Sequence, residues 1–281
     1  MLYAASARRR SVCRGFVLNL LALSACAYTA TAPRPVRAPV APDSVDGWAV
    51  TPKRSTWQGR ELMCLVVSDD PSVDNLHSVA HPDHPRYRAF EELEDPHGAL
   101  GVWPSAYAAC ASLQKIASEL KRPPTVLELG CGAGLPSLYS SVLLESPRVV
   151  ATDVEAVPLS FLEAARSAHV ETGSFATCTL DVTYAAVDDI KNFDVVVCAD
   201  MLYNTDVATA LGALLGAAAC GAGAPEFLVC DPGRRGRDHF LDAFGAASGL
   251  SPMFVDQAVP DGCVDVFDGT PIGAVGVLAA R

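Results

Sequence analysis

The sequence predicts an α/β protein in which a mostly parallel sheet carries helices on both faces and ends in an antiparallel edge. Three observations predict this class. From residue 104 onward, apolar runs alternate with stretches that repeat apolar residues at helical intervals. The runs are continuously apolar, as in FDVVVCA, which is typical of parallel strands buried on both faces. The C-terminal tail has extended runs with no helix between them, which indicates antiparallel pairing.

The elements follow in chain order from the same patterns. Apolar residues recur at helical spacing from Pro104 to Leu120, and Pro123 and Pro124 then stop this first helix. The strands expected in the parallel sheet are 125–129, 148–153, 175–182, 193–199 and 226–231. The further helices expected are 136–144, 158–169, 206–220 and 237–247. In the tail, extended runs are expected over 253–259, 264–267 and 274–279.

The N-terminal part of the chain has the pattern of a targeting leader. Four arginines precede the apolar segment 16–25, small residues follow it, and no acidic residue occurs before Asp43. The segment is too short to span a bilayer, so no stable membrane insertion is expected. The leader predicts an organellar protein, of the mitochondrial matrix or the plastid stroma. We therefore divide the chain into a cleavable, disordered leader (1–45), an extension with one short strand and a loop (46–97), and the main domain (98–281).

Composition limits the partners of the protein. The formal net charge is −11, and no stripe of Lys or Arg appears, which argues against nucleic-acid binding. An acidic protein is suited to small ligands or basic protein partners. The ten cysteines form no CxxC pair, which argues against zinc or disulfide exchange chemistry and favours a reduced compartment. We expect a monomer.

The segment ELGCGAG predicts a nucleotide-cofactor site. Gly130, Gly132 and Gly134 follow an apolar run and let the backbone approach a ligand closely. Asp153, about 20 residues on, ends the next apolar run, where a carboxylate can accept hydrogen bonds from ribose hydroxyls. A dinucleotide site needs glycine where this chain has Leu135, so the pattern favours S-adenosylmethionine. Glu128, at the end of the first strand, is expected to accept from the amino group of the cofactor.

Two further strand ends are expected at the same edge of the sheet. Asp181, after the third strand, is placed to receive the adenine amino group, although a turn-forming aspartate is an equal alternative. After the fourth strand, Asp200 and Tyr203 would flank the group that accepts the methyl. Ala199, which precedes Asp200, is expected to line the cofactor site.

The order ELGCGAG, ATD, LDV and ADMLY resembles the seven-strand class I methyltransferases, and Asp200-x-x-Tyr203 resembles their protein-lysine branch. GALGVWPSAYAACASL resembles the element before the domain in that branch, which implies that Trp103 contacts the cofactor. DPGR at 231–234 resembles the electron-transfer-flavoprotein β-subunit lysine methyltransferases. The resemblance covers 98–281 and implies a Rossmann-like seven-stranded sheet, S-adenosylmethionine as cofactor and an unidentified protein as substrate. Residues 46–97 match nothing in the family, which leaves the substrate open.

The resemblance implies a mechanism in which Asp200 holds the lysine amine by a hydrogen bond and Tyr203 forms a wall of the channel. Two alternatives stay open. One is a methyltransferase for small amines such as nicotinamide. The other is a catalytically inactive cofactor-binding module that holds a basic partner on its acidic surface. Leu135 makes a dehydrogenase the least favoured enzyme class.

Two polar clusters need a separate interpretation. His77, His81 and His84 have metal-like spacing, but neighbouring prolines argue against one helical face and no Cys or paired acid accompanies them, so no metal is expected. A second cluster consists of three arginines, Arg234, Arg235 and Arg237. It is interpreted as a solvated cluster at the start of a helix, with contact to an acidic substrate surface as the alternative.

Overall fold

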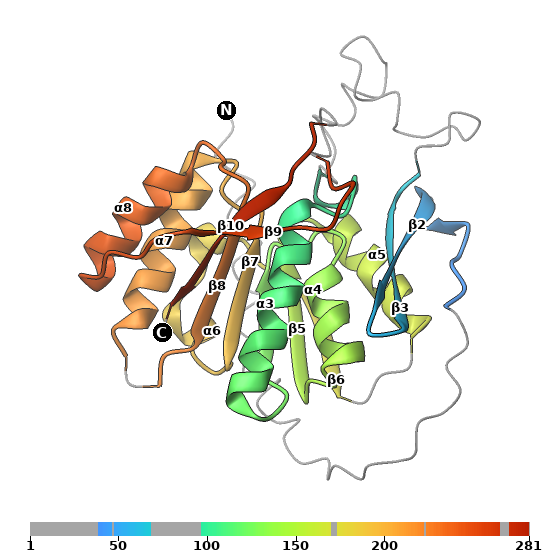
Figure 1. Ribbon diagram of the computed structural model, residues 1–281, viewed down its shortest axis with the longest axis horizontal. Coiled ribbons are helices and arrows are strands. Elements are labelled where there is room, and N and C mark those ends of the chain that lie inside the picture. Colours follow the sequence, from blue (N-terminus) through green and yellow to red (C-terminus); the bar gives the residue numbers. More distant parts are fainter. Residues whose placement is uncertain are drawn as a thin grey trace, which may run out of the picture.

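The computed structural model describes residues 39–46, 48–68, 97–169, 173–221, 223–264 and 270–280. Within these residues the central element is a seven-stranded sheet in the order β6-β5-β4-β7-β8-β10-β9 (Figure 1). The first five strands are parallel, and β10 and β9 run antiparallel at one edge. The predicted class and C-terminal edge are therefore confirmed. The strands are β4 (Val126–Leu129), β5 (Arg148–Asp153), β6 (Ser174–Thr179), β7 (Val195–Ala199), β8 (Glu226–Asp231), β9 (Val255–Ala258) and β10 (Ala274–Ala280).

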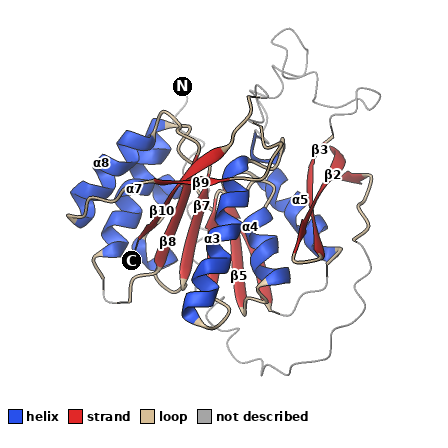
Figure 2. Ribbon diagram, viewed as in Figure 1, coloured by secondary structure: helices blue, strands red, loops and turns tan. Residues whose placement is uncertain are grey.

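Helices cover both faces of this sheet (Figure 2). One apolar core lies under α3 (Pro104–Leu120), α4 (Leu135–Leu138) and α5 (Ala156–Ser167). The other lies under the helices on the opposite face. In β7 the side chains divide between the two cores, with Val195 and Val197 in the first and Val196 in the second. This is why the strands are continuously apolar. The helices of the second face are α6 (Val187–Ile190), α7 (Thr205–Ala219) and α8 (Arg237–Ser248).

The helix predicted at 136–144 differs from the observed one. The α-helix α4 ends at Leu138 and continues as a π-helical segment, η5 (Tyr139–Leu143). The Ser140 hydroxyl donates to the Pro136 carbonyl at 2.8 Å, and the amide of Leu144 bonds to Tyr139 five positions back. A serine that bonds back to the preceding turn competes with the regular helical ladder, and apolar periodicity does not report this.

A hairpin joins the main domain from the N-terminal extension, where the sequence predicts only one strand. β2 (Trp48–Trp57) and β3 (Arg60–Val67) pair antiparallel, with the short β1 (Ser44–Val45) beside β2. Residues 62–67 of β3 are buried in the same core as α3 and α5. The sequence does not predict β2 because the polar run PKRS interrupts any apolar pattern in it. Most side chains of β2 are partly or fully exposed, so the strand does not need such a pattern.

Two contacts fasten the hairpin to the helices. Trp57 packs edge-on against Tyr139, with ring centroids 5.0 Å apart. The amide of Met63 donates to Nε2 of His169 at 3.1 Å, just beyond the end of α5. The other nitrogen of this ring, Nδ1, lies 2.8 Å from the carbonyl oxygen of Ala165. His169 must therefore carry its proton on Nδ1 and be neutral to make both bonds.

Candidate functional site

The glycine loop leaves β4 as the tight turn that the sequence predicts. Gly130, Gly132 and Gly134 have φ values of 65°, 50° and 71°. A Cβ built on Gly132 would lie 2.5 Å from the carbonyl oxygen of Gly98, and one on Gly130 would lie 1.9 Å from the sulfur of Met201. A side chain at either position would displace a neighbouring segment, so the loop depends on glycine for space as well as for conformation.

Asp153 lies against this loop from the end of β5. Its Oδ2 accepts a hydrogen bond from the amide of Gly132 at 2.9 Å, and its Oδ1 accepts from the amide of Glu155 at 3.1 Å. Burial raises the pKa of the Asp153 carboxyl, and the two amides oppose that rise. The structure therefore brings Asp153 and the loop together, and each oxygen keeps a lone pair that a ligand hydroxyl can use.

Glu128 is buried at the end of β4 and points toward the first turn of α4. Its Oε2 accepts from the amide of Ser137 at 2.9 Å and also from the Ser137 hydroxyl. Burial raises the pKa of Glu128 to about 8, with hydrogen bonds from Ser137 lowering it and the charge of Asp153 raising it further. The carboxyl thus has a structural partner within the chain, and contact with a cofactor amino group stays a prediction.

Asp200 follows β7 in a left-handed conformation, with φ of 61°. Its side chain is 5% exposed and is held from two elements. Nε of Arg234 donates to Oδ1 at 2.7 Å, and the hydroxyl of Ser105 on α3 donates to Oδ2 at 3.3 Å. Burial raises the pKa of Asp200, whereas the bond and the positive charge of Arg234 lower it.

Tyr203 and Met201 connect this segment to the glycine loop. Tyr203 is 52% exposed, and partial desolvation raises the pKa of its hydroxyl, followed by the negative charges of Asp153, Asp200 and Glu155. Met201 fills the space over Gly130. The ends of β4, β5 and β7 therefore meet at one edge, with the Asp200–Tyr203 segment beside the glycine loop, as the sequence predicts.

Trp103 and the arginines complete this edge. Trp103 precedes α3, and the guanidinium carbon of Arg234 lies 5.5 Å from the centre of its ring. The interpretation of the arginines as a solvated cluster is wrong for Arg234 and Arg237, which are partly buried in ion pairs, whereas Arg235 is exposed. Arg234 bonds to Asp200, Nε of Arg235 donates to the carbonyl of Tyr203 at 2.8 Å, and Nε of Arg237 donates to Asp231 at 2.7 Å. The sequence does not predict the contacts of Arg234 and Ser105 with Asp200, because Asp200 follows β7 whereas Arg234 follows β8 and Ser105 lies on α3.

Asp181 caps a short turn, which is the alternative that the sequence left open. Its Oδ1 accepts from both the amide and the hydroxyl of Thr183, at 2.9 and 2.7 Å, and so ends β6 before residue 182. Ala199 is the last residue of β7 and is partly exposed beside Asp200. Contacts of Asp181 and Ala199 with a cofactor stay predictions.

The chemistry of this edge fits S-adenosylmethionine. Glu128 and Asp153 are acceptors for an amino group and for ribose hydroxyls, and residues 128–135 between β4 and α4 carry no basic side chain. Asp153 suits the ribose of either cofactor class, but Leu135 stands where a dinucleotide loop needs glycine, which favours the sulfonium cofactor. Glu128 would hold the amino group, Asp153 the ribose, and the glycine turn would make room for both.

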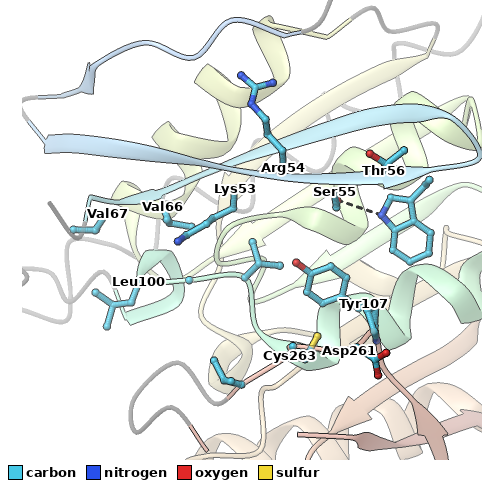
Figure 3. A pocket seen from close by; sticks show the side chains of 16 residues that line it. Lys53, Arg54, Ser55, Thr56, Val66, Val67, Leu100, Tyr107, Asp261 and Cys263 are labelled. Atoms are coloured by element: carbon cyan, nitrogen blue, oxygen red, sulfur yellow. Dashed lines mark hydrogen bonds between the residues drawn. The ribbon is translucent and has the colours of Figure 1, made fainter. Parts of the chain in front are cut away.

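An open hollow lies beside this edge, between the hairpin and the turn at 260–264 (Figure 3). Its volume is about 650 Å³. Leu100, Gly101 and Val102 form one side, directly before Trp103, and Tyr107 projects from the first turns of α3. Ser105, which bonds to Asp200, lies two positions before Tyr107 and so on nearly the opposite face of that helix. The hollow and Asp200 therefore lie on different sides of α3.

The described residues lack two other kinds of site. No group of three or more His, Cys, Asp or Glu in this part of the chain could hold a metal ion, and His77, His81 and His84 lie outside it. No helix in the described ranges has the length and apolar character needed to cross a membrane.

The chain is similar to known proteins. The sequence model of a family described as lysine methyltransferase matches residues 82–244. Among solved structures, the chain is similar to magnesium protoporphyrin IX methyltransferase from Synechocystis with bound S-adenosylmethionine (15% identity, 73% of this chain and 94% of that chain, TM-score 0.43). It is also similar to a putative RNA methyltransferase from Pyrococcus horikoshii (14% identity, 62% and 81%, TM-score 0.41). No curated protein matched.

The family match spans the glycine loop, Asp153, Asp200 and the arginines that follow β8, which are the parts that the fold brings to one edge. The chain belongs to the lysine methyltransferase family of S-adenosylmethionine-dependent enzymes.

Proposed function

We propose that this protein transfers a methyl group from S-adenosylmethionine to the side-chain nitrogen of a lysine in another protein. The observation that carries the proposal is the position of the Asp200–Tyr203 segment against the glycine loop, through Met201 over Gly130. A carboxylate and an aromatic ring then flank the place where a methyl acceptor would meet the cofactor. The family match supports lysine as the acceptor.

The chain mainly positions and desolvates the reacting groups. When bound, S-adenosylmethionine supplies an electrophilic methyl group on sulfur. Asp200 accepts a hydrogen bond from the amine and directs its lone pair, and the ring of Tyr203 forms the wall beside it. The nitrogen–carbon bond forms as the sulfur–carbon bond breaks, the electron pair stays on sulfur, and one proton passes from nitrogen to solvent.

Two features support a macromolecular acceptor rather than a small amine. Tyr203 is half-exposed, so the amine can arrive on a long side chain from outside. The hollow between the hairpin and the 260–264 turn offers about 650 Å³ for the chain that flanks the lysine.

Location and partners are inferred from sequence. We infer that residues 1–45 direct the protein to the mitochondrial matrix or the plastid stroma, where it acts as a monomer on a protein substrate. Residues 1–38 lie outside the described part of the chain, and the end of the predicted leader is not disordered, because Ser44 and Val45 pair with β2. The resemblance of Asp231–Arg234 to the electron-transfer-flavoprotein enzymes stays a prediction.

The proposal is tested with purified protein, methyl-labelled S-adenosylmethionine and an organellar extract. The wild type is expected to label a protein band, and Asp200→Asn is expected to lose at least about 100-fold of that activity, as for a group that orients the nucleophile. S-adenosylhomocysteine binding to Asp200→Asn should remain within about threefold, which separates the acceptor site from the cofactor site. Label found only in the low-mass fraction, or full activity of Asp200→Asn, contradicts the proposal.

A further inference from the structure

We propose that Arg234 is a positioning residue that neutralises Asp200, so that the target amine meets a hydrogen-bond acceptor with almost no net charge. This inference rests on the proposed lysine methylation. It deepens that function by assigning a role to an arginine that the sequence placed in solvent. The contact that carries it is the 2.7 Å ion pair between Nε of Arg234 and Oδ1 of Asp200, with the two side chains only 20% and 5% exposed.

The Asp200 carboxylate has room for both its partners and a substrate. Two oxygens accept about four hydrogen bonds. Arg234 uses one site on Oδ1, and Ser105 uses one on Oδ2. The remaining sites can accept from an amine, so Arg234 need not leave for the substrate to bind.

The loop after β8 fixes Arg234 in this place. Asp231 is fully buried, and its carboxylate accepts from the amides of Gly233 at 2.9 Å and of Arg234 at 3.1 Å. It also accepts from Arg237 at 2.7 Å. The guanidinium of Arg234 lies over the ring of Trp103. Backbone, ion pair and ring contact together hold the guanidinium without a further adjustment when substrate arrives.

The loop also clamps the Asp200–Tyr203 segment from outside. The amide of Gly236 donates to the carbonyl of Leu202 at 3.0 Å, and a Cβ on Gly236 would lie 2.5 Å from that oxygen. Arg235 holds the carbonyl of Tyr203. The loop 231–237 is therefore the support on which the Asp200–Tyr203 segment rests, and Arg234 is its contact with the carboxylate.

The chemistry explains why a counter-ion helps here. Methyl transfer needs a neutral amine, but a bare carboxylate beside a lysine stabilises the ammonium form and raises the pKa of that lysine by about 1–3 units. A guanidinium stays charged at all working pH values and offsets this effect. The Asp200–Arg234 pair thus orients the amine without raising the pKa of the target lysine.

Other ionisable groups face this cluster and must be counted in a pH experiment. Some of these groups change the pKa of Asp200 or Tyr203 by their charge, and the pKa of another is changed by the charge of Asp200. They lie at or just after the ends of β5 and β8 and in the Asp200–Tyr203 segment. They are Asp153, Glu155, Tyr203, Cys230 and Asp231.

The first test compares three variants in the labelled-methyl assay with organellar extract from about pH 6.5 to 9.5. Arg234→Gln is expected to shift the acidic limb of the rate profile upward by about one unit or more and to lose roughly tenfold in rate at pH 7. Arg235→Gln removes the same charge one residue away and should keep the wild-type limb at a lower overall rate, because Arg235 supports the carbonyl of Tyr203. Arg234→Lys restores the charge and should bring the limb back toward the wild-type position.

The second test needs no substrate. Carboxyl-¹³C NMR follows the Asp200 signal, assigned by its loss in Asp200→Asn, through a pH titration of wild type and Arg234→Gln. Loss of the guanidinium should raise the pKa of Asp200, whereas Arg235→Gln should leave it closer to wild type. An unchanged Asp200 pKa in a folded Arg234→Gln contradicts the electrostatic role. If Arg234→Gln fails to fold, Arg234→Lys replaces it in the test. An acidic limb of the Arg234→Lys rate profile that is shifted upward by about one unit, as expected for a carboxylate without a counter-ion, then contradicts the electrostatic role.

The two proposals fail in different ways. A wild-type protein that methylates no protein overturns the proposed function. An active wild type whose Arg234→Gln variant keeps the wild-type acidic limb overturns only the role of Arg234. A purely structural role would lower the rate at every pH and leave the limb in place.

Discussion

We propose that protonation of the Glu128 carboxyl controls cofactor binding. Burial raises its pKa to about 8, so the group is mostly protonated near neutral pH in the ligand-free protein. A cationic amino group pairs with the ionised form only. If Glu128 holds that group, binding requires the carboxyl to lose its proton, and affinity must rise as the pH increases through about 8.

We predict that the affinity for S-adenosylhomocysteine rises about 25-fold between pH 6.5 and 8.5, the change expected when the pH crosses a pKa near 8. Glu128→Gln should bind more weakly at pH 8.5 and lose this pH dependence. Titration calorimetry measures both. Glu163→Gln, which removes a carboxylate on the outer part of α5, is the matched control and should keep the wild-type slope. A wild-type affinity that does not change with pH contradicts the pairing.

Gly132 gives a second test at the same scale, because it combines a left-handed φ of 50° with contact to the carbonyl of Gly98. Gly132→Ala is expected to lower the free energy of unfolding by about 1–2 kcal/mol and to weaken S-adenosylhomocysteine binding more than tenfold. Gly223→Ala has a similar φ of 76° but no atom within 4 Å of its Cβ, so it should lose stability without losing affinity. Equal affinities for the two variants would show that the loop is not at the cofactor.

Some residues of the candidate site could be predicted from the sequence, and others could not. Gly130, Asp153 and Asp200 could be predicted because each follows an apolar strand directly, and parallel strands end at a common edge. Ser105 and Arg234 could not be, because their contact with Asp200 depends on how α3 and the loop after β8 fold over β7. Glu128 was placed correctly at a strand end, but its bonds to Ser137 depend on the turn into α4.

Among the elements, the sequence predicts one strand of the β2–β3 hairpin and not the other. The apolar run in β3 predicts a strand, and its burial against α5 confirms one. β2 is not predicted because its charged residues, Lys53 and Arg54, are exposed and interrupt the apolar pattern. The bond from Met63 to neutral His169 ties this hairpin to the end of α5, and it gives the attachment a dependence on pH.

The sign of that dependence follows from the pKa of His169. Burial lowers it below the ordinary value of 6.5, and the charges of Arg54 and Arg60 lower it further. The unfolded chain therefore takes up a proton at higher pH than the folded one. The stabilisation is complete above about pH 6.5 and is lost as the pH falls from there through the folded-state pKa.

We predict that wild type loses about 1 kcal/mol more of its free energy of unfolding between pH 7.5 and 5.5 than His169→Gln does, the size of one or two hydrogen bonds. Urea unfolding at the two pH values measures the difference. His239→Gln changes an exposed histidine on α8 and should behave as wild type. If His169→Gln and wild type lose equal stability, the histidine does not hold the hairpin.

For the whole molecule, the sheet order brings four distant parts of the chain to one edge: the glycine loop, Asp153, the Asp200–Tyr203 segment and the loop 231–237. Alternating strands and helices predicted that edge, and the family match agrees with it. The hollow beside it depends on the hairpin and on the turn at 260–264, which are far apart in sequence. No local pattern predicts a space that such separate segments enclose.

The most direct measurement is tandem mass spectrometry of the protein that becomes labelled when the enzyme, methyl-labelled S-adenosylmethionine and organellar extract are combined. The account predicts a methyl group on the ε-nitrogen of a lysine, present with wild type and missing with Asp200→Asn. A methyl group on any other type of residue, or label confined to small molecules, would contradict it.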